Sequence, residues 1–516
     1  MLGLHIWVSI AVVLFAVFPL TDTDIWWHLA CAREWVTTWT PVREPVVHVH
    51  EFFQQTVAFV YNIGGASLLV SFKALLWGVV FFLFLLPLLR SSKLSKGPVT
   101  LVVVASVAIL LYVFRYQFEI RPVLFSLLFL GVYWNVLPWL LRDAAIPYGI
   151  KKISATVLIL VIQWLWCKCQ GLYILGPLFA FLVFVSVSVR KAIAWQAAFI
   201  LLLFAMPFLH RDGMNLFLYP FGLLDRLLGL SPSAAIFASE IAENRSPVTL
   251  LLNGENVIQS VLMIVLCMAG TVVSCATLFK CFRNPAERFQ EIWKYVTLLV
   301  TASLAFVAER NFVLFLPVLV AIAIPAVNKA LSKFCQSHPS LQSLATTHIH
   351  QSSYFYQLCS KLRFPTTFYL LFPILVIAFL LGFWTKSLAS YDRSMIAFQR
   401  VPVAATAWMV GHPHPGRLFN DDRAGGYLAF MNPSDSTYID GRFILKTADF
   451  FERYLEYSET PSLFLRDADS LDIDRVVLPL RYYARWNGLL MTLDSAENWH
   501  VVYRDSLFVV MDRTKF

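Results

Sequence analysis

Two carboxylates follow the first apolar run of the chain, which spans residues 4–20. Asp22 and Asp24 come first, and the side chains after them are Trp26, Trp27 and His28. A carboxylate held at a lipid–water boundary can act as the general base toward an acceptor hydroxyl, and tryptophan rings can form a wall that stacks on a sugar. The structural alternatives are that one aspartate caps a re-entrant helix and that the tryptophans form an interfacial belt. Because two acids directly after an apolar run exceed what capping requires, we expect at least one of them to be functional.

Further ionisable and polar side chains stand beside other apolar runs, namely Glu119, Arg121, Lys168, Gln170, Glu309 and Arg310. Ionisable groups near membrane depth are costly, which makes them functional candidates by default. Glu119 is interpreted as a second acid of the site. Arg121 is interpreted as a phosphate contact, because its guanidinium group presents a planar fork of donors. The alternative is that Glu119 and Arg121 simply pair with each other.

His48, His50 and Glu51 form a His-x-His-Glu string. Imidazole and carboxylate groups are metal ligands, but a solvated or interfacial loop is the favoured interpretation, so no metal site is assigned here. A divalent cation at Asp22 and Asp24 is the other option, and two carboxylates alone are a weak signal for it.

Two strings stand out near the C-terminus. Asp440-Gly441-Arg442 is expected at the end of a strand, where Asp440 and Arg442 either face the membrane site or close a salt bridge. Gly425-Gly426 lacks the following Lys and the strand–turn–helix pattern of a phosphate loop. The paired glycines are therefore expected to permit a tight turn before a strand.

The composition indicates which solvent this chain requires. Of its 516 residues, 58% are hydrophobic and 14% are charged, whereas soluble domains have about 45–50% and about 25%. Apolar surface on this scale needs lipid, which excludes a soluble enzyme and a disordered protein. Residues 1–390 hold 27 Lys and Arg against 15 Asp and Glu, and residues 391–516 hold 14 against 17. The positive excess lies in the hydrophobic part, where it orients a membrane protein, so no nucleic-acid partner is expected.

At about 20 residues per spanning helix, the apolar runs predict eleven membrane spans. They are 4–20, 67–89, 98–115, 122–141, 153–167, 171–189, 192–209, 256–279, 292–307, 311–327 and 365–386. Every Lys and Arg cluster between spans falls on one side, which is also the side of the N-terminus. By the positive-inside rule that side is the cytoplasm. We therefore expect a multi-pass protein of a bacterial inner membrane with a periplasmic C-terminal domain.

A separate soluble α/β domain is predicted over residues 391–516, after a membrane domain over residues 1–390. Short β-type runs are expected at 417–420, 427–431, 437–440, 475–480, 500–504 and 507–512, with helical stretches at 447–457 and 482–493. Strands that alternate with helices favour an α/β layer fold. The last two runs, divided by Asp505-Ser506, predict a terminal hairpin.

Several strings, in order along most of the chain, resemble a bacterial family of polytopic proteins related to the GT-C glycosyltransferase superfamily. They are Asp22-Thr-Asp24-Ile-Trp-Trp-His28-Leu, His50-Glu51-Phe, Ile120-Arg121-Pro122-Val-Leu-Phe-Ser, Leu165-Trp-Cys-Lys-Cys-Gln-Gly171, Arg310 at the start of a span, Phe419-Asn420, Gly425-Gly426-Tyr427-Leu428 and Ile439-Asp440-Gly441-Arg442. The first and the last are the most specific. Two strings depart from the family pattern: Lys168-Cys169-Gln170 stands in place of Asn-x-His, and Glu44-Pro45-Val46-Val47 in place of Asp-Pro-Phe-Ser.

By analogy of fold, the resemblance implies an inverting membrane glycosyltransferase with a polyprenyl-phosphate-linked sugar donor. Asp24 or Asp22 would be the base and Glu119 a supporting acid, while Arg121 and Arg310 would contact the donor phosphate. The other candidate substrate contacts are Trp26, Trp27, His28, Glu51, Lys168 and Gln170. The acceptor would be a glycan, lipid or protein outside the cytoplasm, and no cofactor is assigned. Two alternatives remain open, namely a lipid or solute translocator and a catalytically degenerate scaffold.

Overall fold

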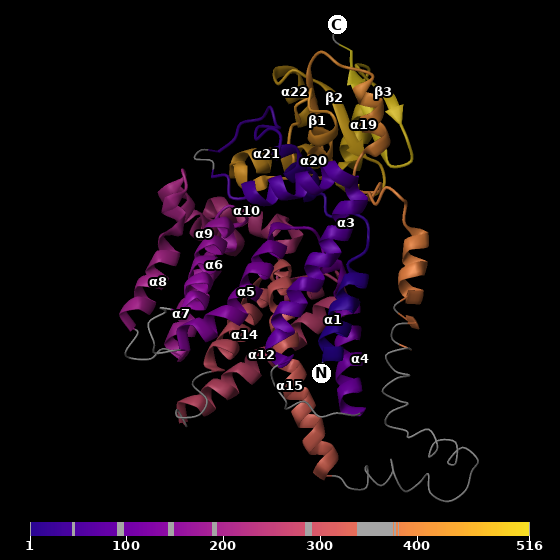
Figure 1. Ribbon diagram of the computed structural model, residues 1–516. Coiled ribbons are helices and arrows are strands. Elements are labelled where there is room, and N and C mark those ends of the chain that lie inside the picture. Colours follow the sequence, from indigo (N-terminus) through magenta and orange to yellow (C-terminus); the bar gives the residue numbers. More distant parts are fainter. Residues whose placement is uncertain are drawn as a thin grey trace, which may run out of the picture.

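A computed structural model describes residues 2–43, 47–89, 98–142, 149–187, 193–283, 291–337, 375, 378–379 and 381–514. A layer of long helices forms one part of the molecule, and a smaller unit with a β-sheet covers one end of that layer (Figure 1). The N-terminus lies at the end of the helical layer that is remote from this unit (Figure 1). The predicted string Glu44-Pro45-Val46 lies outside the described residues.

Helices occupy each of the first ten predicted spans. They are α1 (Leu2–Phe15), α3 (Glu51–Leu89), α4 (Pro98–Val113), α5 (Pro122–Arg142), α6 (Ile150–Trp166), α7 (Leu175–Val187), α8 (Ile193–Ala205), α12 (Val257–Arg283), α14 (Ile292–Val307) and α15 (Phe312–Ser337). Among the described residues, four helices are long and apolar enough to cross a membrane, or five if a bent pair counts as one span. The eleventh predicted span, 365–386, lies largely outside the described residues, so the count of eleven stays a prediction.

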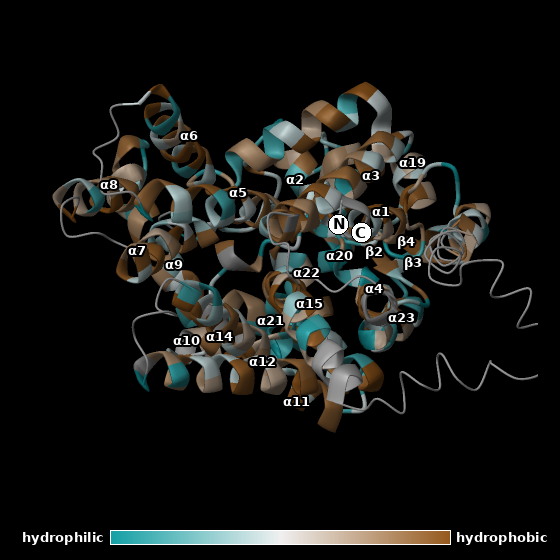
Figure 2. Cartoon of the chain, turned by 60° about the horizontal axis from the view of Figure 1, so that its bottom comes forward, coloured by the Kyte–Doolittle hydropathy of each residue, from teal (hydrophilic) through white to brown (hydrophobic). Residues whose placement is uncertain are grey.

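The helices of this layer consist largely of hydrophobic residues, as the brown stretches of the cartoon in Figure 2 show. On α12, the side chains of Val265, Met268 and Val272 are all exposed. Exposed apolar side chains along a long helix require a lipid environment, which agrees with the composition.

Residues 21–66, which connect the first two predicted spans and are called the first outer segment below, are partly helical. A short helix, α2 (Asp24–Cys31), follows Asp22, and α3 begins at Glu51 rather than at residue 67. Helix α3 is bent at Gly64 and Gly65, and Gly65 has a φ of 62°. That left-handed conformation favours glycine. The axis of α3 therefore changes direction at this point.

The C-terminal unit contains a four-stranded sheet in the order β1-β2-β4-β3. Strands β1 (Arg417–Asn420) and β2 (Ile473–Pro479) are parallel, whereas β4 (Phe508–Arg513) pairs antiparallel with β2 and with β3 (Trp499–Arg504). The accompanying helices are α19 (Val403–Val410), α20 (Asp422–Met431), α21 (Ala448–Glu459), α22 (Pro461–Ser470) and α23 (Asn487–Asp494). The predicted α/β arrangement and the terminal hairpin are confirmed.

Two predicted strands are wrong. Residues 427–431 belong to helix α20, and residues 437–440 contribute only an isolated bridge between Thr437 and Thr38. Helix α20 begins because the Asp421 side chain accepts a hydrogen bond from the Ala424 N–H at 3.0 Å, which satisfies one of the free donors of a helix start.

The paired glycines lie inside helix α20 and form no turn. A Cβ atom on Gly425 would lie 1.8 Å from the carbonyl oxygen of Ile439, and one on Gly426 would lie 2.7 Å from the backbone nitrogen of Trp27. Glycine is therefore required at these two positions because other backbone segments approach α20 closely, and not because the backbone adopts a special conformation. The glycines let α20 pack directly against α2, which brings the C-terminal unit onto the first outer segment.

Candidate active site

Helix α2 carries the tryptophans into the interior of the protein. Trp26 is 0% exposed, and its ring meets Tyr427 edge-on at 4.8 Å between centroids. Trp26 therefore packs inside the protein in this structure, and its contact with a substrate stays a prediction. Trp27 is also buried, and its ring lies 5.9 Å from the Arg442 guanidinium group. The two indoles join α2 to the C-terminal unit.

Asp22 and Arg121 form the centre of an ion-pair chain. Arg121 Nε donates to Asp22 Oδ2 at 2.5 Å and Arg121 Nη2 donates to Asp22 Oδ1 at 3.0 Å. On its other side, the same guanidinium group donates to both carboxylate oxygens of Glu243, at 2.6 and 2.7 Å. The expected pairing of Arg121 with Glu119 is not found. Asp22 also accepts a hydrogen bond from the Asp24 N–H at 3.2 Å, although the N-cap residue of α2 is Thr23, which makes no side-chain capping hydrogen bond.

Asp24 is the carboxyl group of this site that is best suited to proton transfer. Burial, followed by the neighbouring Asp22 carboxylate, raises the pKa of Asp24 to about 7, although Arg121 opposes the shift. A base is most effective when its pKa lies near the working pH. Asp22, in contrast, has both oxygens occupied by Arg121. Asp22 is therefore paired with Arg121, whereas Asp24 is not, and the assignment of Asp24 as the base stays a prediction.

Glu119 lies on the short segment between α4 and α5 and faces helix α3. Thr21 Oγ1 donates a hydrogen bond to Glu119 Oε1, and Lys73 Nζ lies 3.8 Å from Glu119 Oε2. Burial raises the pKa of Glu119, and the nearby lysine opposes that shift. Lys73 was not predicted from the sequence. A single lysine inside the apolar run 67–89 was the available signal, because an ionisable group within a span usually has a functional partner.

Lys168 belongs to a second polar cluster, together with Glu51 and Asp212. Lys168 Nζ lies 2.7 Å from Asp212 Oδ2 and 3.5 Å from Glu51 Oε2. Gln170 Oε1 accepts a hydrogen bond from Ser126 at 2.7 Å, which holds it over helix α5. Lys168 is therefore paired mainly with Asp212, with Glu51 as a more distant partner.

The histidines fill the space between these clusters. His28 is buried, with Gln54 Nε2 3.4 Å from His28 Nδ1, and His50 Nδ1 lies 2.9 Å from the Cys169 carbonyl oxygen. Burial lowers the pKa of His50 to about 4 and lowers that of His28 well below its ordinary value. Both rings are therefore neutral near pH 7. The His28 ring is enclosed by protein in this structure, and its contact with a substrate stays a prediction.

Arg310 opens helix α15 through the short turn η7 (Glu309–Asn311). It has no ion-pair partner within 4.0 Å among the described residues, whereas Glu309 Oε1 accepts a hydrogen bond from Tyr116 Oη at 2.9 Å. A guanidinium group with no carboxylate within ion-pair distance is a suitable contact for an anion.

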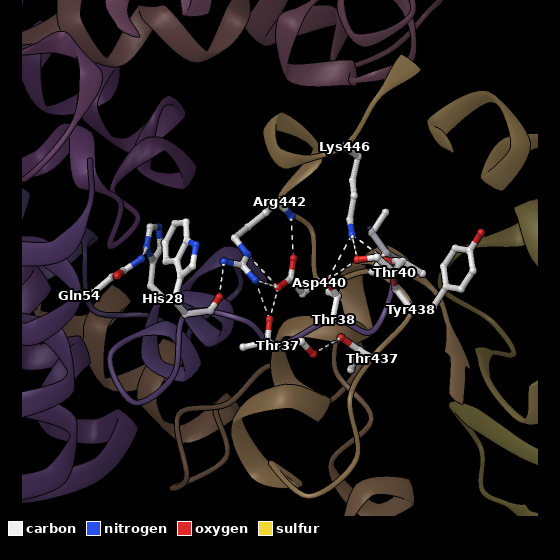
Figure 3. Close-up of polar contacts among 12 residues, drawn as sticks. His28, Thr37, Thr38, Thr40, Gln54, Thr437, Tyr438, Asp440, Arg442 and Lys446 are labelled. Carbon is white, nitrogen blue, oxygen red and sulfur yellow. Dashed lines mark hydrogen bonds and ion pairs between the residues drawn. The ribbon is translucent and has the colours of Figure 1, made fainter. Parts of the chain in front are cut away.

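The Asp440–Arg442 pair joins the C-terminal unit to the first outer segment, as Figure 3 shows. Arg442 Nε and Nη2 both donate to Asp440 Oδ2, at 2.8 and 2.5 Å, while Nη1 and Nη2 donate to the Trp35 carbonyl oxygen and the Thr37 hydroxyl. The salt-bridge interpretation is confirmed. The pair also adjoins the membrane site, because a Cβ atom on Gly441 would lie 3.5 Å from Asp24 Oδ1.

A cavity of about 360 Å³ opens beside this pair. It is lined by Trp35, Val36, Val42, His48, Asp212, Arg442 and Leu445. The cavity lies between the first outer segment and the C-terminal unit. Within the part of the chain that the structure describes, no group of three or more His, Cys, Asp and Glu side chains is arranged to hold a metal ion.

Comparison with known proteins identifies the fold. No protein-family model and no curated protein matches the chain. Among solved structures, the archaeal oligosaccharyltransferase AglB from Archaeoglobus fulgidus, in complex with an inhibitory peptide and a dolichol-phosphate, matches with a TM-score of 0.53 and 14% identity over 98% of this chain and 73% of that one. An Archaeoglobus fulgidus oligosaccharyltransferase in complex with Zn and sulfate matches with a TM-score of 0.52 and 14% identity, over 92% and 68% of the two chains. This chain therefore has the fold of these oligosaccharyltransferases, which agrees with the predicted resemblance.

Proposed function

We propose that this protein is a membrane glycosyltransferase that moves a sugar from a polyprenyl-phosphate-linked donor to an acceptor outside the cytoplasm. The observation that carries the proposal is the Asp24 carboxyl group, whose pKa burial and the adjacent Asp22 raise to about 7, next to a guanidinium group aligned by two carboxylates. A base tuned to neutral pH beside a phosphate-compatible cation is the pair of groups that sugar transfer from a phosphate carrier requires.

The reaction is a single displacement at the anomeric carbon. Asp24 accepts the proton of the acceptor hydroxyl as its oxygen forms the new bond to the anomeric carbon. The bond between that carbon and the phosphate oxygen breaks, and the phosphate leaves with the bonding electron pair. Attack from the face opposite the phosphate inverts the configuration of the sugar.

Cationic side chains stabilise the phosphate as it departs. Arg121 is held in place by Asp22, and Arg310 stands at the start of α15 with no carboxylate partner among the described residues. Charge stabilisation of this kind is often the largest contribution to a transferase barrier. The fold match supports the class of donor, because AglB is described in complex with a dolichol-phosphate and a peptide. We infer by analogy that the donor here is polyprenyl-linked and that the acceptor is a glycan, lipid or protein.

The test is sugar transfer by the purified full chain in proteoliposomes that contain polyprenyl-phosphate-linked sugars. Asp24→Asn should reduce the rate by about 100-fold or more, the usual contribution of a general base, with expression and folding retained. Glu34→Gln is the matched control, since Glu34 is an exposed carboxylate on the same outer segment. Full activity in Asp24→Asn and in Asp22→Asn would remove the base assignment.

The same proteoliposomes separate the alternatives. Movement of lipid or solute across the membrane without sugar transfer would favour a translocator. Retained cellular function after simultaneous loss of Asp22, Asp24 and Glu119 would favour a scaffold.

A further inference from the structure

Four of the five N–H donors of the Arg121 guanidinium group are hydrogen-bonded to carboxylates in this structure. Three of its nitrogens make four hydrogen bonds, two to Asp22 and two to Glu243. Both contacts are bidentate, which is the geometry that arginine also uses for phosphate oxygens. A donor phosphate can therefore reach the Arg121 fork only if one of the two carboxylates leaves.

Glu243 is the carboxylate that can leave at lower cost. Its side chain is 47% exposed, whereas that of Asp22 is 4% exposed. Glu243 stands on the three-residue turn η5 (Ala242–Asn244), between helices α10 (Pro232–Glu240) and α11 (Pro247–Leu252). Asp22, in contrast, also accepts the Asp24 N–H and supports the start of the buried helix α2. Moving a short turn disturbs less packing than moving α2.

The position of Glu243 suits a more highly charged anion than a carboxylate. Desolvation raises the pKa of Glu243, but Arg121, Arg310 and Arg400 together outweigh it and hold that pKa below its ordinary value. Three guanidinium groups thus act on one carboxylate. Since Asp22 balances only one of them, a phosphate group, with up to two negative charges, would complete the neutralisation better than Glu243 does.

We propose that Glu243 occupies the place of the phosphate of the polyprenyl carrier and is displaced when that phosphate enters, so that Glu243 sets the affinity and selectivity of the phosphate site. The inference rests on the proposed function. The sugar-linked donor is a phosphodiester with one negative charge, whereas the polyprenyl phosphate released by transfer is a monoester with up to two. The released carrier therefore displaces Glu243 more readily than a phosphodiester headgroup does.

The test is a binding titration of the full chain in detergent with polyprenyl phosphate, read by native mass spectrometry. Glu243→Gln keeps the size of the side chain and removes its charge, so we expect the dissociation constant to fall at least about fivefold. Glu255→Gln is the matched control. Glu255 lies close in the chain and pairs with Arg245 at 3.2 Å rather than with Arg121, so its dissociation constant should stay within about twofold of wild type. Arg121→Ala should lose binding.

Two further probes identify the ligand and the movement. Inorganic phosphate should compete with polyprenyl phosphate in both wild type and Glu243→Gln, whereas phosphatidylglycerol should not. If phosphatidylglycerol binds as tightly as polyprenyl phosphate, the selectivity assigned to Glu243 is wrong. Hydrogen exchange of residues 241–245 should accelerate when polyprenyl phosphate binds wild type, and unchanged exchange under saturation would overturn the displacement.

The outcomes separate this inference from the proposed function. If wild type binds polyprenyl phosphate and transfers sugar, but Glu243→Gln binds equally or more weakly, Glu243 does not compete and only this inference fails. If neither wild type nor any variant binds polyprenyl phosphate, and transfer is absent, the proposed function fails and this inference falls with it.

Discussion

The buried ion pair between Asp440 and Arg442 should decide whether the C-terminal unit stays attached to the first outer segment. Asp440 is 2% exposed and Arg442 is 5% exposed. Removing the guanidinium group in Arg442→Ala would leave a buried carboxylate with the Thr37 hydroxyl and one backbone N–H as its partners. Breaking a buried pair from one side costs about 3–5 kcal/mol, because the remaining charge is uncompensated. We expect about 4 kcal/mol of lost stability at this junction.

Hydrogen exchange at the amides that cross the junction measures this loss directly. Thr437 N–H donates to the Thr37 carbonyl oxygen at 3.1 Å, and Arg43 N–H donates to the Leu445 carbonyl oxygen at 2.7 Å. If local opening exposes these amides, a loss of about 4 kcal/mol should speed their exchange by about 1000-fold. Arg453→Ala is the control, since Arg453 forms an exposed pair with Glu456 at 3.0 Å, and such pairs contribute about 1 kcal/mol or less.

If Arg442→Ala speeds the exchange of these amides by less than about tenfold, the ion pair does not hold the junction. The Arg453→Ala control should stay below this tenfold limit. The double variant Asp440→Asn with Arg442→Met adds a second check: its loss should be smaller than the sum of the two single losses, because no unpaired charge remains.

Three further predictions concern packing and pH. Gly426→Ala should destabilise the protein by about 2 kcal/mol or more, because its Cβ atom would lie 2.7 Å from the Trp27 nitrogen. Gly222→Ala is the control and should not destabilise it, because no atom lies within 4 Å of a Cβ atom there. Equal melting temperatures of the two variants would show that α2 and α20 separate easily. The rate of sugar transfer should rise with pH through about 7, because Asp24 must be deprotonated to act as a base, and a rate that is flat between pH 6 and 8 would contradict its role. Asp435 and Asp474 outweigh desolvation and raise the pKa of His414 to about 9. The stabilisation of the folded protein by protonated His414 should be complete below the ordinary pKa of 6.5 and be lost as pH rises through about 9. The melting temperatures of wild type and His414→Gln should therefore converge above pH 9.

Much of the fold followed from local pattern. The apolar runs predicted the positions of the helices because each run is long enough to satisfy its own backbone in lipid. The predictions of strands β1 and β2 and of the terminal hairpin were also correct, because a short β-branched and aromatic run bounded by turn residues is a local signal for a strand. The prediction of a strand at residues 427–431 was wrong because their aromatic and apolar composition suits a strand as well as a helix. The Asp421 cap and the packing against Trp27 favour the helix.

The sequence by itself determined the chemical groups of the site, and the tertiary structure decided their partners. Asp22, Asp24, Glu119 and Arg121 were identifiable because charged groups beside apolar runs are costly. That Arg121 binds Asp22 and Glu243, with |i−j| of 99 and 122, and that Glu119 faces Lys73, depended on helices meeting across the bundle. The raised pKa of Asp24 likewise depends on burial and neighbouring charges that are distant in sequence. Residue type is a local property, whereas ion pairing, desolvation and access to a substrate arise only when remote segments pack together.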